Sequence, residues 1–199
     1  MNVGTTGRRI YIGKLAGTSV FDPLGEKVGV IHDVVVTFRL NSTANVIGFV
    51  VEVGPRKRVF LPFTRVTAIE SGSVITTGLL NIRSFNQRPV ETLVITELFD
   101  REVTMNDGSG VVKILDVAMQ QRRPRDWIIS TLHVQRVRTT TLGFKRGGTT
   151  MTVRVDEVSS LLKTDSNQAA TALIQHTEDM KAADLADFIH DLPAERQLA

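Results

Sequence analysis

The sequence predicts a mainly β protein, with two small β-barrels in tandem and a short α-helical segment at the C-terminal end. Three observations support this fold class. Over about the first 160 residues, short runs of Val, Ile, Thr and Phe alternate with turn residues, as in small β domains. The same pattern occurs twice. Near residue 163 the composition changes, because all 15 glycines precede that point and eight alanines follow it.

The first copy shows the pattern most clearly. Asp22-Pro23-Leu24-Gly25 predicts a turn, since Pro presets φ and Gly tolerates the positive φ that follows. The candidate strands around it are Val28–Phe38, Val46–Val53 and Arg58–Leu61.

The second copy repeats this order with an Asp at the same place. Val20–Val34 corresponds to Val103–Val117, which aligns Asp33 with Asp116. A structural role for both carboxylates follows, as acceptors for backbone donors at a strand end or turn. Farther on, we match Val46-Ile47 with Trp127-Ile128 and Val59–Ile69 with Met151–Leu161. The expected organisation is a flexible N-terminus at 1–7, a first barrel at 8–90, a second barrel at 91–163 and a helical segment at 164–199.

Charge separates the helical segment from the barrels. Residues 1–163 carry 22 Lys and Arg against 14 Asp and Glu, whereas residues 164–199 carry 2 against 7. Leu185, Phe188, Ile189 and Leu192 lie at helical spacing, and Pro193 suits the first position of another helix. Ala199 follows soon after, so we expect a truncated helical domain that continues beyond it.

Several function classes are disfavoured. The chain has no Cys, no signal peptide and no apolar run long enough to span a membrane, which fits the cytoplasm. Neighbouring strand residues such as His32 and Asp33 point to opposite faces, so they do not form an acid–base pair. We expect a protein that is not an enzyme and needs no cofactor; no catalytic or metal-binding spacing relates its histidines, His32, His133, His176 and His190.

The segment Val20–Val35, with Val59–Val66 downstream, resembles the PRC-barrel domain family. The resemblance implies a small SH3-like β-barrel that acts as a binding platform. The second copy departs from the family pattern, because Arg154-Val155 stands where Pro62-Phe63 stands. We therefore expect a divergent second barrel.

The tail Met180–Ala199 resembles the start of the cytosolic N-domain of MgtE-type magnesium transporters, through its D-L-A-D and L-P-A-E-R motifs. The resemblance links the chain to magnesium transport or sensing, with Mg²⁺ as a possible ligand of the complete protein. Asp184, Asp187 and Asp191 can share one helix face and are weak metal candidates. A solvated acidic face explains them more simply.

Two basic clusters are weak candidates for partner binding: Arg56-Lys57-Arg58, and Arg122-Arg123 with Arg125. Arg8-Arg9 is a further basic pair. The net charge of the barrels is modest for a nucleic-acid-binding protein, and Trp127 fits a core position. Solvated loops or contacts to an acidic protein surface are therefore favoured over nucleic acid.

The function expected is a non-enzymatic cytoplasmic interaction or regulatory module, linked to magnesium by resemblance. Its partner is another protein or a downstream helical or CBS region of its own chain. The alternative is an RNA- or ribosome-associated adaptor that uses the basic loops. The sequence leaves the oligomeric state open.

Overall fold

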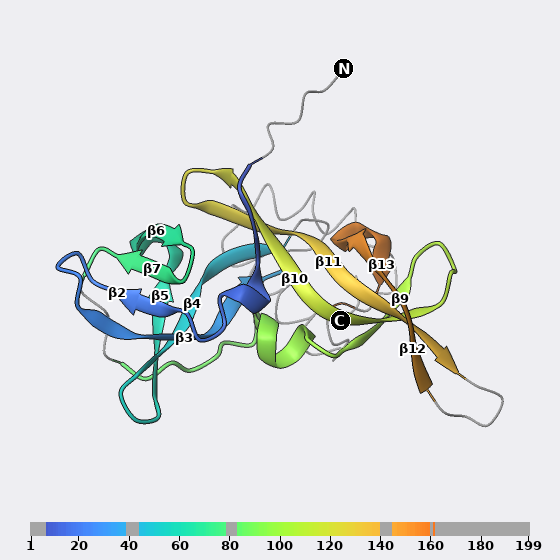
Figure 1. The fold of residues 1–199 in the computed structure, drawn as a ribbon, viewed down its shortest axis with the longest axis horizontal. Coiled ribbons are helices and arrows are strands. Elements are labelled where there is room, and N and C mark those ends of the chain that lie inside the picture. The colour runs from blue at the N-terminus through green and yellow to red at the C-terminus, as the bar shows by residue number, and fades with distance from the viewer. Residues whose placement is uncertain (1–6, 39–43, 79–82, 140–144, 160, 162–199) are drawn as a thin grey trace, which may run out of the picture. The chain divides into compact units, whose positions relative to one another are not determined.

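The computed structural model describes residues 7–38, 44–78, 83–139, 145–159 and 161, all within the compact unit Met1–Leu162. This part of the chain is mainly β, as predicted (Figure 1). The predicted helical segment at 164–199 lies outside the described residues. No helix in the described part is long and apolar enough to cross a membrane.

In its described residues, the first copy contains seven strands and two short 3-10 turns. They are β1 (Arg9–Tyr11), η1 (Ile12–Lys14), β2 (Ser19–Phe21), β3 (Lys27–Thr37), β4 (Asn45–Val53), β5 (Lys57–Pro62), η2 (Phe63–Arg65), β6 (Val66–Glu70) and β7 (Ser73–Thr76). The three strands predicted here are confirmed as β3, β4 and β5, each within a residue or so of its expected limits.

The second copy repeats the same order. Its elements are β8 (Glu91–Leu93), the π-helical turn η3 (Val94–Leu98), β9 (Glu102–Met105), β10 (Val111–Arg123), β11 (Asp126–Thr139), β12 (Lys145–Arg154), the 3-10 turn η4 (Val155–Glu157) and β13 (Val158–Ser159). Only β7 has no counterpart in the described residues of this copy. In the first copy β7 lies between β2 and β6, whereas in the second β13 pairs directly with β9.

The described strands of both copies form one continuous sheet. Its central path runs β13-β9-β10-β11-β4-β3-β2-β7-β6, and the copies meet where β11 pairs antiparallel with β4. Trp127 pairs with Val46, and Ile128 pairs with Asn45. The path reads almost the same from either end, so the two copies are related by an approximate two-fold operation at this pair of strands.

The register corrects one predicted correspondence. Asp33 pairs with Val50 and Val36 with Val46, while Asp116 pairs with His133 and Met119 with Ile129. Val46 therefore corresponds to Ile129, and not to Trp127 as the sequence suggested. The error is two residues. Val46 lies 13 residues after Asp33 and Ile129 lies 13 residues after Asp116, because the β-bulges of β3 and β10 occupy equivalent positions in the two copies. By contrast, Pro62 and Arg154 hold the equivalent positions predicted.

Each copy also adds a strand to the other. β1 pairs antiparallel with β10 of the second copy, and β8 pairs antiparallel with β3 of the first. The buried apolar side chains of both copies form one cluster, from Ile12 in η1 to Leu161. The two copies are thus joined by a shared core and an exchange of strands.

Candidate functional site

Asp33 is the most deeply buried carboxylate in the described part of the chain, with 0% of its surface exposed. Its oxygens accept hydrogen bonds from the backbone N–H groups of Val34, Ile95 and Thr96 at 2.7, 2.8 and 2.9 Å. The Thr96 hydroxyl donates a fourth at 2.7 Å. The first N–H groups of a helical turn have no partner within the turn, so η3 offers free donors to this carboxylate.

Asp116 of the second copy makes the corresponding contact with η1 of the first copy. Its Oδ1 accepts from the N–H of Gly13 in η1 at 2.9 Å and from the N–H of Val117 at 2.7 Å. A Cβ on Gly13 would lie 2.8 Å from Asp116 Oδ2, so a side chain here would displace this carboxylate. Each copy therefore supplies a turn that binds the other copy's aspartate, and η1 and η3 lie side by side (Figure 1).

We call this pair of contacts the reciprocal lock. The expectation that Asp33 and Asp116 accept backbone donors is confirmed. The sequence did not show that the donors come from the other copy, 62, 63 and 103 residues away. Both carboxylates are engaged in holding the two copies together.

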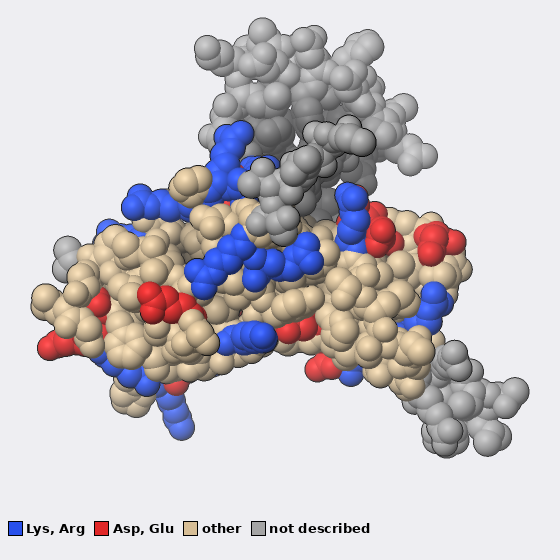
Figure 2. Space-filling view, turned by 45° about the horizontal axis from the view of Figure 1, so that its top comes forward, with Lys and Arg blue, Asp and Glu red and all other residues tan. Residues whose placement is uncertain are grey.

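Five arginines gather at the other end of β10. Gln121 N–H donates to the carbonyl of Arg8, and Arg9 pairs with Gln120, so β1 lies alongside the base of the β10–β11 hairpin. All five side chains are exposed. We call them the arginine surface: Arg8, Arg9, Arg122, Arg123 and Arg125. Figure 2 shows Lys and Arg side chains gathered over this face.

Within the described residues, most of this positive charge has no acidic partner. Arg122 Nε donates to Asp126 Oδ2 at 2.9 Å, which forms an ion pair. Among the described residues, no acidic partner is seen for the other four guanidinium groups. Elsewhere in the described residues some cations are paired, such as Lys113 with Asp100 at 2.7 Å and Arg154 with Asp156 at 2.6 Å.

The duplication provides an internal comparison for this surface. Arg9 on β1 corresponds to Glu91 on β8, because each is the first residue of its three-residue strand. Arg9 pairs with Gln120 of β10, and Glu91 pairs with the equivalent residue of β3, Thr37. Glu91 is 3% exposed and accepts a hydrogen bond from Arg88 Nε at 2.7 Å. The fold therefore accepts an acidic, internally paired side chain where the first copy exposes Arg9.

Arg125 has an uncommon backbone conformation. It follows Pro124 in the two-residue turn between β10 and β11 and has φ of 64°. A positive φ after Pro is typical of a type II turn, for which Gly is the ordinary residue. A non-glycine residue in this region costs on the order of 1 kcal/mol. Turn formation therefore does not explain why an arginine stands here.

The cluster Arg56-Lys57-Arg58 lies elsewhere. These residues are in the turn after β4 and the start of β5, and Arg56 also has positive φ, 65°. Arg58 lies 3.9 Å from Glu52. The arginine surface adjoins the opposite end of β4, about 25 Å away along the strand. The structure therefore does not bring the two predicted basic clusters together.

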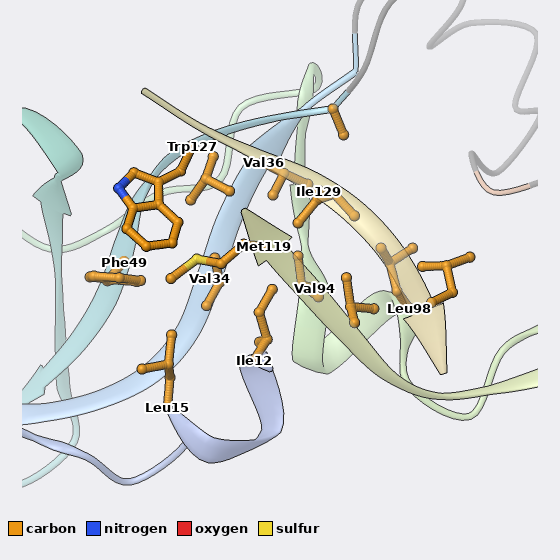
Figure 3. Close-up of a cluster of buried hydrophobic side chains, with 14 of the residues drawn as sticks. Ile12, Leu15, Val34, Val36, Phe49, Val94, Leu98, Met119, Trp127 and Ile129 are labelled. Carbon is orange, nitrogen blue, oxygen red and sulfur yellow. The ribbon is translucent and has the colours of Figure 1, made fainter. Parts of the chain in front are cut away.

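Trp127 belongs to the core, as the sequence suggested. It is 5% exposed, and its ring lies 5.7 Å from that of Phe63 in the first copy, which in turn lies 5.2 Å from Phe49. Figure 3 shows the indole among buried side chains of both copies. The arginine surface thus gains no stacking platform from this aromatic residue.

The remaining candidates do not form a second site in the described residues. No group of three or more His, Asp or Glu side chains in this part is placed to bind a metal. Asp184, Asp187 and Asp191 lie outside the described residues. Two exposed pKa shifts have local causes: Ser109 donors lower the pKa of Asp107, and the hydrogen bond to Asp156 raises the pKa of Arg154.

Comparison with known families gives two matches. The PRC-barrel domain matches residues 7–79, and the Actinomycetes SH3 domain matches residues 92–164. The PRC-barrel resemblance of the first copy is thereby confirmed, and the second copy is similar to a different, SH3-type family. No curated protein matches the chain. Both matches end before the tail, so its resemblance to an MgtE-type N-domain stays a prediction.

Proposed function

We propose that this chain is a non-enzymatic interaction module that binds a partner at the arginine surface. The observation that carries this proposal is a group of five exposed arginines at the base of the β10–β11 hairpin, four of them without an acidic partner in the described residues. The similarity to an SH3 domain supports the same function class.

The other conspicuous polar groups favour a structural role. Asp33 and Asp116 use their carboxylate oxygens in the reciprocal lock. His32 is half-buried and is the extra residue of the β-bulge between Ile31 and Asp33. Binding at the surface therefore fits the described residues better than acid–base chemistry in the core.

Site-specific photo-crosslinking tests the proposal. Gln121 lies among the arginines and is partly exposed, and Thr67 on β6 is an exposed control position. A photoreactive residue at Gln121, introduced into the whole chain in the producing cell, should give a discrete covalent adduct. The same residue at Thr67 should not.

The adduct must also depend on charge. Combining the photoreactive Gln121 position with Arg9→Gln and Arg123→Gln should remove the adduct, because the partner loses two charge-assisted contacts. An adduct that persists after these substitutions, or that forms equally from Thr67, would contradict binding at this surface.

A magnesium-linked regulatory role is a further part of the proposal and rests on the resemblance of the tail. If the tail responds to magnesium, titration of the whole chain at millimolar Mg²⁺ should give a binding isotherm and a higher Tm. Replacing Asp184, Asp187 and Asp191 by Asn should remove both effects, because hard cations prefer carboxylate oxygens. Absence of heat and of any Tm change in the unaltered chain would reject this part and leave surface binding untouched.

A further inference from the structure

We propose that the arginine surface binds an extended acidic segment of a protein partner, and that Arg125 contributes affinity that the fold does not require. This inference rests on the proposed function and adds the chemistry and conformation of the ligand. It is carried by the kind, spacing and backbone conformation of the arginines.

The spacing suits a short extended segment. Arg9 lies opposite Gln120, Arg122 is two residues farther along β10, and Arg125 is in the turn beyond. At about 3.3 Å per residue these positions span roughly 15 Å, the length of four or five residues of an extended peptide. Guanidinium groups bind carboxylates through paired N–H donors, which favours Asp and Glu side chains as ligands.

The surface lacks two features expected of a single-stranded nucleic-acid site. Bases usually stack on exposed aromatic rings, but Trp127 is buried and Tyr11 on β1 is half-buried. The charge is also small, because one of the five arginines is paired with Asp126. Nucleic-acid-binding proteins commonly make about six to ten phosphate contacts.

A proline-rich ligand fits equally poorly, although the second copy is similar to an SH3 domain. Proline-rich peptides bind grooves lined by aromatic side chains. Within the described residues of the second copy, the aromatic side chains are Phe99, which is half-buried, and Trp127, which is in the core. Apart from Pro124, the exposed side chains of its hairpin end are arginines.

Substitution of Arg125 distinguishes a role in binding from a role in folding, through the direction in which the Tm changes. Its φ of 64° is the conformation that glycine adopts readily. Arg125→Gly therefore removes one charge and relieves backbone strain at the same site. If the arginine serves folding, its replacement lowers the Tm; if it serves binding, the Tm is kept or raised while affinity falls.

The experiment measures fluorescence anisotropy of three labelled probes with the whole chain at low and physiological salt. The probes are an octaglutamate peptide, an octaglutamine peptide and an eight-nucleotide single-stranded RNA. The surface variant is Arg9→Gln/Arg123→Gln. The matched control, Lys27→Gln/Lys57→Gln, removes two exposed cations from the first copy away from this surface.

The chain should bind octaglutamate and not octaglutamine. The surface variant should weaken octaglutamate binding by about tenfold, and the control by less than about twofold, because local and not net charge determines the contact. Arg125→Gly should weaken the same binding by about threefold without lowering the Tm.

Three results would overturn the inference. One is equal weakening by the surface and control variants, and another is no octaglutamate binding by the unaltered chain. The third is surface-dependent binding of RNA that is tighter than that of octaglutamate. In each case the Gln121 crosslink still decides the proposed function, because a charge-dependent adduct would show a partner of different chemistry at the same surface.

Discussion

Asp33 shows how one side chain can determine the stability of a duplicated fold. Its carboxylate is fully buried and accepts four hydrogen bonds, three of them from η3 of the other copy. Asp116 is only half-buried and accepts one such bond, from Gly13. The reciprocal lock is therefore symmetric in topology and unequal in strength.

This inequality leads to a prediction. Asp33→Asn replaces an acceptor-only carboxylate by an amide, whose NH₂ group would face N–H donors, so buried donors lose their partner. We expect the free energy of unfolding to fall by about 2–3 kcal/mol for Asp33→Asn and by about 1 kcal/mol for Asp116→Asn. Denaturant unfolding followed by Trp127 fluorescence measures both. Equal losses would show that the extra donors at Asp33 contribute nothing.

For single residues, the sequence predicted the role of a side chain better than it predicted which residues lie beside it. It assigned Asp33 and Asp116 a backbone-binding role, and it identified Arg122, Arg123 and Arg125 as exposed charges. It did not place Arg8 and Arg9 beside them. Residues more than 110 positions apart become neighbours only through pairing of β1 with β10, and that pairing leaves no local signal in the sequence.

Among the elements, the exchange of short strands is the feature that joins the copies. β1 and β8 have three residues each, too few to show a recognisable alternation, and the sequence did not predict them. The long strands β3 and β4 have strong β-branched runs and were predicted, whereas β10 and β11 were expected only in part, as counterparts of these strands in the second copy. Their order across the junction depends on the register of Asn45 with Ile128, which lies outside any local pattern.

The exchanged strand can be tested with a proline. Gln121 N–H donates to Arg8, so the antiparallel pattern makes Ile10 and Met119, two residues on, the next hydrogen-bonded pair. Ile10→Pro removes the donor of that pair. We expect faster amide hydrogen exchange in β10 of the second copy, although the substitution is in the first.

Ile10→Thr is the matched control, because the equivalent position of β8 is Thr92. It should keep the pairing and leave exchange in β10 close to that of the unaltered chain. If the proline variant accelerates exchange only within the first copy, β1 does not stabilise β10.

For the molecule as a whole, the shared core predicts a single cooperative unit over the described residues. Trp127 of the second copy packs on Phe63 of the first, and the buried cluster continues through both. Neither copy has a complete set of buried partners alone. Small domains with one core unfold in a single transition.

Cutting the connection between the copies tests this unity. After insertion of a protease site behind Gly78 and cleavage, the two parts should still elute together and keep the native near-UV signal of Trp127. Each part, separated in denaturant and refolded alone, should lack a cooperative transition, and mixing should restore it. Two parts that fold independently would contradict a shared core.

The reciprocal lock also sets an order of events during protein synthesis. Translation proceeds from the N-terminus, so β3 and Asp33 leave the ribosome long before Ile95 and Thr96 exist. The N–H of Gly13 is without its acceptor for longer still, because Asp116 is 103 residues downstream. The N-terminal half thus cannot satisfy its buried carboxylate while it is the only part outside the exit tunnel, and its final structure is deferred until most of the second half has emerged.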